Sequence, residues 1–305
     1  MKLYRVQDEG MERSIAGIFQ DSDVAFIHVP RAGSTSLQTA IFGQDGDKLP
    51  PRVFLAAEQI EARCSYGRFQ EMYRIGCVRN PWARLVSAYE ALRTVPLDGT
   101  APAEDVIGSQ LVRKLGSFPA VVDYLFKLHC KDALNDSRWP LPLPVLGSNI
   151  GQNFCPVQFR PQYTFLTDAD GNLLVDALFA LERIKEGVEM LKSGAADTRN
   201  LGRRLNVGKM PQLCEGPYGG DIDYLLYYHD PWLVMKVSRI YERDFRLFHY
   251  DGEGPPDEQC PRRTDQPRRD KTIKSIKKKK PAKDNVEGKS EEEPMSPSEQ
   301  DCSVM

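Results

Sequence analysis

Residues 26–37 constrain the fold of this chain more than any other stretch. An apolar run at 26–29 leads through a small polar turn into a segment with helical patterning. This order places backbone N–H groups and three hydroxyls at a helix N-terminus, where hydrogen bonds and the helix dipole favour a phosphate. The candidate anion ligands in this turn are Arg31, Ala32, Gly33, Ser34, Thr35 and Ser36. The G-x-x-x-x-G-K-[ST] spacing of nucleoside triphosphatases is absent, and an ordinary strand–helix turn is the alternative.

A second strand-to-helix segment follows at residues 72–89. The apolar run at 72–78 predicts a buried strand, and Pro81 suits a helix start because its missing N–H has no partner to lose there. Four residues have the i, i+3, i+4, i+7 spacing of a core-facing helix stripe: Trp82, Leu85, Val86 and Tyr89. That leaves Arg79 at the strand end and Ser87 on another face, where both could hold an anion.

Together these two segments resemble the sulfotransferases that use 3'-phosphoadenosine 5'-phosphosulfate (PAPS). The resemblance is closest to the Golgi carbohydrate sulfotransferases of the chondroitin, dermatan and heparan 2-O type, and to their bacterial relatives. Stretches at 159–176, 204–209 and 240–250 agree with it in the family's order. The resemblance covers roughly residues 22–250 and implies an α/β, P-loop-like fold with a central, mainly parallel sheet flanked by helices.

The resemblance also implies roles for individual residues. The first turn would hold the 5'-phosphosulfate, with Arg31 offsetting the charge that grows on the leaving phosphate. Arg79 and Ser87 would hold the 3'-phosphate; a surface ion pair and a helix-surface serine are the respective alternatives. Lys209 would lie near the cofactor and could reach a phosphate or the sulfuryl oxygens, and an exposed loop lysine is the alternative.

The chain departs from the family at two positions. The family usually has Lys where this chain has Arg31, which keeps the charge but is bulkier and permanently protonated. The family also tends to carry a His before a segment that matches residues 54–60, and Phe54 stands there instead. Glu58 is then the nearest candidate base, with a solvated helix face as the alternative. His28 is another candidate, with packing in the strand as the alternative.

The composition fits a chain with a sizeable core. It has 305 residues, of which 41% are hydrophobic, and a net charge of −2 argues against a nucleic-acid polycation. Seven cysteines are scattered without a C-x-x-C pair, and there are only four histidines. We therefore predict no metal site, and cysteine use that suits a reducing compartment better than a secretory one.

The two ends of the chain bear on location. The N-terminus lacks the apolar run of a signal peptide, and no window approaches 18 apolar residues. The charged, weakly hydrophobic composition of residues 251–305 predicts a disordered tail. In this tail a basic stretch with four lysines at 277–280 precedes an acidic stretch. Cys302 matches the C-a-a-X prenylation pattern, with a chance match as the alternative. We expect a cytoplasmic or peripheral membrane protein that touches membrane through the basic tail and Cys302. A Golgi location is the alternative if an anchor is missing from this chain.

From these observations we predict a sulfotransferase domain over residues 1–250 that moves a sulfuryl group from PAPS to an acceptor hydroxyl, on a carbohydrate. A catalytically silent PAPS- or glycan-binding relative is the alternative. A nucleotide kinase is disfavoured because the Walker Lys-Ser pair is absent. The predicted catalytic residues are Arg31 and Glu58, and the predicted PAPS-binding residues are Arg31, Ala32, Gly33, Ser34, Thr35, Ser36, Arg79, Ser87 and Lys209.

Overall fold

The computed structural model describes residues 3–8, 11–19, 24–42, 54–64, 66–98, 100–132, 134, 154–193 and 222–255. The chain divides into one unit over Met1–Arg263 and a second over Thr264–Met305. All described residues belong to the first unit, so the predicted tail lies outside the described residues beyond position 255. No helix in the described ranges is both long and apolar enough to cross a bilayer.

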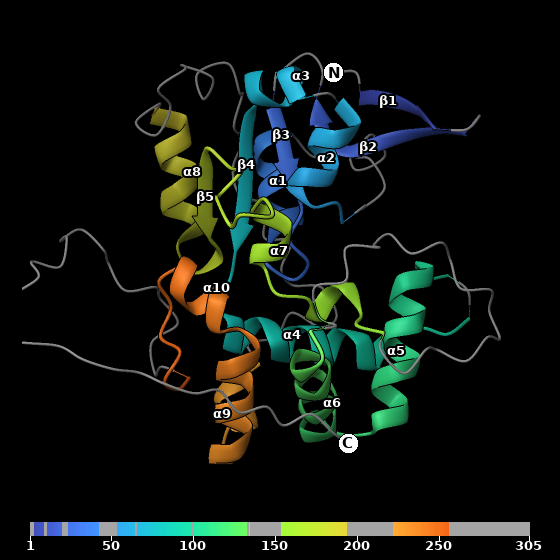
Figure 1. Cartoon of the computed structure of the whole chain (residues 1–305), viewed down its shortest axis with the longest axis vertical. Coiled ribbons are helices and arrows are strands. Elements are labelled where there is room, and N and C mark those ends of the chain that lie inside the picture. Colours follow the sequence, from blue (N-terminus) through green and yellow to red (C-terminus); the bar gives the residue numbers. More distant parts are fainter. Residues whose placement is uncertain are drawn as a thin grey trace, which may run out of the picture. The chain divides into compact units, whose positions relative to one another are not determined.

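A five-stranded sheet in the order β1-β2-β3-β4-β5 forms one layer of the domain (Figure 1). Its strands are β1 (Leu3–Asp8), β2 (Met11–Phe19), β3 (Val24–Ile27), β4 (Tyr73–Val78) and β5 (Ala177–Ala180). The three strands from β3 to β5 pair in parallel, whereas β1 with β2 and β2 with β3 pair antiparallel. The α/β class and the parallel strands are confirmed. The sheet as a whole is mixed, because the two N-terminal strands add an antiparallel hairpin that the sequence analysis did not anticipate.

Helices flank this sheet and form a further layer beyond the carboxyl end of β4 (Figure 1). Those beside the sheet are α1 (Ser34–Phe42), α2 (Ala57–Cys64), α3 (Tyr66–Glu71), α7 (Tyr163–Leu166) and α8 (Ile184–Ser193). Those of the further layer are α4 (Pro81–Thr94), α5 (Ala103–Leu115), α6 (Phe118–Cys130), α9 (Pro231–Ile240) and α10 (Glu242–Leu247). Among the described residues, 3-10 helices join them at η3 (Val157–Phe159), η4 (Leu181–Arg183) and η5 (Tyr224–Tyr227).

The alternation of side chains along β3 divides the core into two clusters. Val24 and Phe26 pack with residues of α1 and α8 on one face of the sheet. Ala25 and Ile27 join the larger cluster on the other face, which runs through α2 and α3 into the helical layer. This is the period-two pattern of a strand that is buried on both faces.

The helix α4 is buried on all sides over its first nine residues. Pro81 occupies the first turn, and the Asn80 side chain caps the helix by accepting a hydrogen bond from the Trp82 N–H at 2.9 Å. The four predicted stripe residues are buried, which confirms the predicted helix and its core face. The remaining positions up to Tyr89 are buried as well, because α5, η3 and η5 also pack against this helix.

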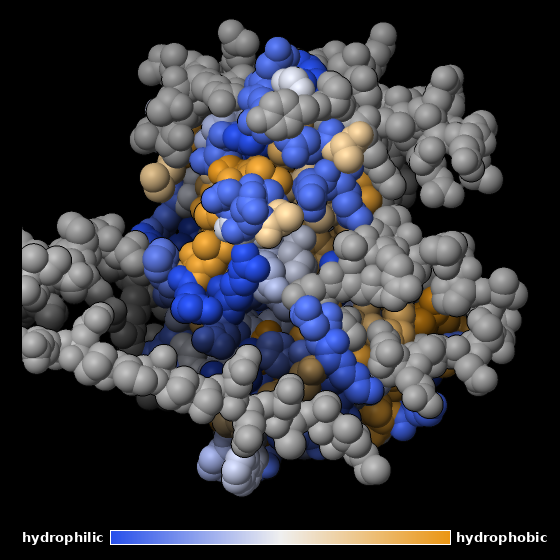
Figure 2. All heavy atoms as spheres, in the orientation of Figure 1, coloured by the Kyte–Doolittle hydropathy of each residue, from blue (hydrophilic) through white to orange (hydrophobic). Residues whose placement is uncertain are grey.

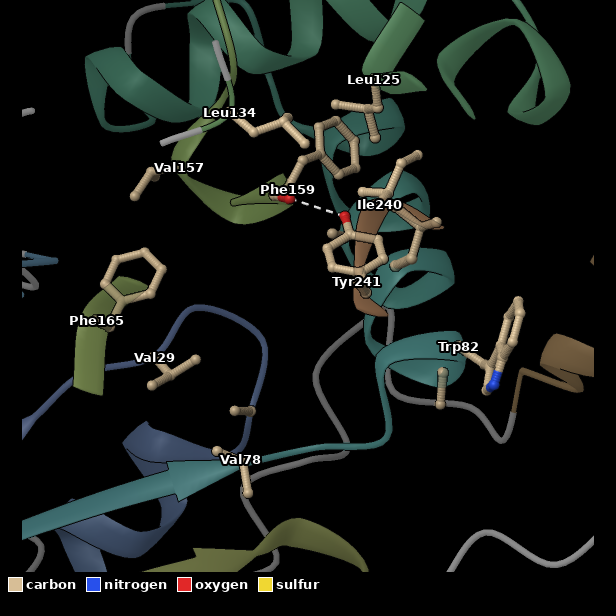
Figure 3. Close-up of a cluster of buried hydrophobic side chains, with 14 of the residues drawn as sticks. Val29, Val78, Trp82, Leu125, Leu134, Val157, Phe159, Phe165, Ile240 and Tyr241 are labelled. Carbon is tan, nitrogen blue, oxygen red and sulfur yellow. Dashed lines mark hydrogen bonds between the residues drawn. The ribbon is translucent and has the colours of Figure 1, made fainter. Parts of the chain in front are cut away.

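The C-terminal segment closes the core against the middle of the chain. The hydroxyl of Tyr241 donates a hydrogen bond to the carbonyl oxygen of Phe159 at 2.8 Å, and both side chains lie beside α4 (Figure 3). Trp82 donates from Nε1 to the carbonyl oxygen of Asp251 at 2.9 Å. Residues far apart in sequence are thus held together around the first turns of α4.

Candidate functional site

The loop between β3 and α1 has the backbone shape of an anion-binding turn. Arg31 has φ 63° and Gly33 has φ 79°, so a non-glycine residue is held in the left-handed region two positions before a left-handed glycine. Such strained residues gather at binding sites, where the surrounding structure maintains them. Gly33 is followed at once by the helical residue Ser34. Left-handed residues next to right-handed ones turn successive N–H groups toward one concave spot that suits an anion.

Ser34 holds this loop closed. Its hydroxyl accepts a hydrogen bond from the Val29 N–H at 3.2 Å and donates to the Val29 carbonyl oxygen at 3.0 Å. Ser34 is also buried. The Ser34 hydroxyl therefore has a structural role in this loop, and its role as an anion ligand stays a prediction. Ser36 is buried to a similar extent, whereas Thr35 is half-buried.

Arg31 and Ser87 meet in the structure. The Arg31 guanidinium donates to the Ser87 hydroxyl oxygen from Nη2 at 3.1 Å and from Nε at 3.3 Å. Arg31 is exposed and Ser87 is buried, with 9% of its surface accessible. A hydroxyl that accepts a hydrogen bond keeps its own hydrogen for another acceptor. The two segments singled out in the sequence thus form one site, although they were assigned to different phosphates.

Arg84 in α4 supports the loop between β3 and α1, and the sequence did not indicate it as a site residue. Its Nε donates to the Pro30 carbonyl oxygen at 2.8 Å, directly before Arg31, and its side chain is 1% exposed. Burial lowers the pKa of Arg84, and the nearby Asp244 opposes that shift. Its Nη2 has no hydrogen-bond partner within the described part of the chain. Only the burial of α4 on all sides distinguishes Arg84 from a surface arginine, and helical spacing alone does not reveal that.

The turn that carries Arg79 lies beside this loop, because neighbouring parallel strands end at the same edge of a sheet. The Gln162 side chain pairs with both backbone groups of Arg79. Its Oε1 accepts from the Arg79 N–H at 2.9 Å, and its Nε2 donates to the Arg79 carbonyl oxygen at 2.8 Å. Glu182 accepts from the Asn80 N–H at 2.7 Å. Two side chains from distant segments therefore fix the backbone of this turn.

Two residues of the C-terminal segment hold the backbone at Gln162 and the side chain of Glu182 in turn. The Asp244 carboxylate accepts from the N–H groups of Gln162 and Tyr163, each at 2.8 Å. Tyr250 donates its hydroxyl to the second carboxylate oxygen of Glu182 at 2.9 Å. Burial raises the pKa of Asp244 to about 6, although its hydrogen bonds and Arg84 oppose the shift. Burial also raises the pKa of Glu182.

The two candidate bases, Glu58 and His28, are not joined to this arrangement by any hydrogen bond or ion pair between described residues that the structure shows. Glu58 lies exposed in the first turn of α2, and no hydrogen bond or ion pair among the described residues joins it to the loop. His28 is 3% exposed, and the centre of its ring lies 4.9 Å from the centre of the Phe26 ring, as expected for packing at the strand end. Lys209 and Cys302 lie outside the described residues.

The structure thus assembles three arginines, a serine hydroxyl and a helix N-terminus at the carboxyl ends of two parallel strands. In the part of the chain that the structure describes, no group of three His, Cys, Asp or Glu side chains is placed to hold a metal ion.

Comparisons with protein-family models, curated proteins and solved structures find no match to this chain. The class defined by fold and site is an α/β protein with a candidate oxyanion site.

Proposed function

We propose that this chain is a PAPS-dependent sulfotransferase that acts on a hydroxyl of a carbohydrate. The observation that carries the proposal is the contact between Arg31 and Ser87, since it unites the two segments that resemble the family's phosphate-binding elements. Open α/β sheets bind ligands outside the carboxyl ends of their strands, which is where this contact lies.

The groups present at the site fit a ligand with separate phosphate and phosphosulfate ends. Arg31 and Arg79 bring planar guanidinium groups, which can donate two parallel hydrogen bonds to an oxyanion. The first N–H groups of an α-helix have no carbonyl partner within the helix, and α1 begins at Ser34 in this loop. Bound PAPS would supply the sulfuryl group to be transferred.

The roles of the chain's own residues follow from charge and position. Arg31 offsets the negative charge that develops on the leaving phosphate, as cations do in phosphoryl transfer. Arg79 and Ser87 hold the 3'-phosphate and so set the register of the reacting group. Arg84, Gln162 and Glu182 keep the two backbone turns in place.

A second candidate function is a silent relative that binds PAPS or a glycan without transfer. The observation that favours it is the exposed position of Glu58, which has no contact with the loop among the described residues. A base must lie within hydrogen-bond reach of the proton that it removes. With Phe54 at the position of the family's histidine, Glu58 is the candidate that the transfer function retains.

The proposal is tested by titrating the full chain with 3',5'-diphosphoadenosine in a calorimeter. Loss of a hydrogen bond to a charged group weakens binding by roughly 10- to 150-fold, so we expect at least a tenfold loss for Arg79→Ala. Arg93→Ala is the matched control, because Arg93 lies in the last turn of α4, the helix that follows Arg79, and pairs with Glu90. Unchanged affinity in Arg79→Ala would remove Arg79 from the site.

A sulfate-transfer assay over a panel of glycans and small alcohols separates the two candidate functions. Transfer to a glycan supports the sulfotransferase. Binding of the nucleotide without transfer to any acceptor supports the silent relative, and a wild-type chain that does not bind the nucleotide overturns both PAPS-based candidates.

The predicted lipid anchor is tested separately. Intact-mass analysis of the protein expressed in eukaryotic cells would show a prenyl group on Cys302. An unmodified C-terminus ending in Met305 would contradict the anchor.

A further inference from the structure

A small hollow lies between the end of α6, residues 161–163 and the junction of α9 with α10. Its volume is about 130 Å³. The polar, charged and aromatic residues that line it are His129, Asp132, Tyr163, Arg239, Glu242, Arg243 and Arg246. The face over α10 is strongly hydrophilic (Figure 2). Neither the loop 28–33 nor the turn 79–80 contributes to the lining, so the hollow is distinct from the candidate site.

The hollow carries an excess of positive charge. Three arginines line it, against the carboxylates of Glu242 and Asp132. Glu242 lies 3.8 Å from Arg239 and 3.6 Å from Arg246, both beyond ordinary hydrogen-bond length. All three of these side chains are more than half exposed, and such surface pairs contribute little. The arginines therefore keep most of their hydrogen-bonding capacity for a ligand.

Arg243 is held in position for such a ligand. Its guanidinium packs over the Tyr163 ring at 4.3 Å from the ring centre. The Tyr163 N–H donates to the buried Asp244 carboxylate, which fixes the backbone under that ring. A guanidinium stacked by its face still presents N–H groups at its edge, in the geometry that matches an oxyanion.

The size of the hollow limits what it holds. Pockets for whole small molecules measure roughly 300–1,000 Å³, more than twice the volume here. We propose that this hollow is a second oxyanion site, which binds a single sulfate or phosphate group through Arg243 with support from Arg239 and Arg246. This site goes beyond the proposed PAPS site and does not depend on it.

Calorimetric titration of the full chain with inorganic sulfate at low ionic strength tests this site. We expect saturable binding with a dissociation constant of about 1 mM or tighter, weakened about tenfold in Arg243→Gln. Arg93→Gln is the matched control, because Arg93 also lies over a tyrosine ring, at 5.9 Å, and pairs with a glutamate outside the hollow. Arg246→Gln, at a side chain that is 75% exposed, provides a second variant if Arg243→Gln does not fold.

The two sources of the group are distinguished by repeating the titration with a monosaccharide sulfate and its unsulfated parent. If the sugar sulfate binds more tightly than inorganic sulfate, the bound group belongs to a glycan. If the two bind equally, the ligand is the free anion. Both results support the site. Three results would overturn the proposal. Sulfate binding could persist in Arg243→Gln, it could fall equally in Arg93→Gln, or it could fail to saturate. Loss of nucleotide binding in the experiment with 3',5'-diphosphoadenosine has no bearing on this result.

Discussion

Replacing Gly33 by alanine tests whether the candidate loop needs glycine for two separate reasons. The first is the backbone, since φ is 79° and a side chain in the left-handed region costs roughly 1–2 kcal/mol. The second is space, since a Cβ at this position would lie 2.4 Å from Cδ1 of Leu181. Overpacking costs typically ~1–3 kcal/mol, and the low end applies here because Cδ1 is the far end of a flexible, partly buried side chain. We expect Gly33→Ala to lower the free energy of unfolding by about 2–3 kcal/mol.

A second glycine separates these two contributions. Gly116 has the same φ of 79°, and no atom of the described residues lies within 4 Å of a Cβ added there. Gly116→Ala should therefore show the backbone cost alone. The double variant of Gly33→Ala with Leu181→Ala should recover the steric part, because removing Cδ1 makes room for the new methyl group.

Urea unfolding followed by circular dichroism measures these three variants and the single variant Leu181→Ala, with the m-value as a check that the unfolded state is unchanged. We expect the Gly33 and Leu181 substitutions to be non-additive by about 1 kcal/mol, with the double variant more stable than additivity predicts. The steric reasoning would be refuted if the two effects added to within about 0.5 kcal/mol, or if Gly33→Ala cost no more than Gly116→Ala.

Three further predictions concern the remaining contacts of the site. Ser87→Ala removes the hydroxyl that accepts hydrogen bonds from the exposed Arg31. The free energy of unfolding should change by less than about 1 kcal/mol, while the affinity for 3',5'-diphosphoadenosine measured by calorimetry falls about tenfold. An unaltered affinity would contradict this prediction. Gln162→Leu leaves both backbone groups of Arg79 without their partner, so urea unfolding should show a loss of about 2–6 kcal/mol, and a loss below about 1 kcal/mol would rule the clamp out. Burial raises the pKa of Asp244 from 3.8 to about 6, so the folded state binds this proton more tightly than the unfolded state. The stability of the wild type relative to Asp244→Asn should therefore fall by up to about 3 kcal/mol as pH rises from about 4 to about 6, and a rise over that range would show the opposite sign.

Local patterns in the sequence were sufficient to place the elements that carry the site. The helix start at Pro81, the stripe from Trp82 to Tyr89 and the turn before Ser34 all depend on residues within one or two helical turns of each other. Capping, proline geometry and hydrophobic spacing act over that range, so a single sequence contains them. The β1–β2 hairpin escaped prediction, because its register shifts between Leu3 and Arg5 and its pattern is irregular.

The environment of each site residue depended on segments that the chain brings together from far away. Gln162 pairs with the backbone of Arg79 across 83 positions, and Asp244 holds Gln162 across another 82. No local pattern distinguishes these polar residues from surface ones.

The sequence by itself determined a strand–turn–helix with arginine and hydroxyl groups at its end, because those features are local. Only the tertiary structure decided that Ser34 closes the loop, that Arg84 is buried beneath it and that Arg31 meets Ser87. The physical reason is that burial and hydrogen-bond partners follow from the packing of α4 between other elements, and that packing is a property of the whole domain.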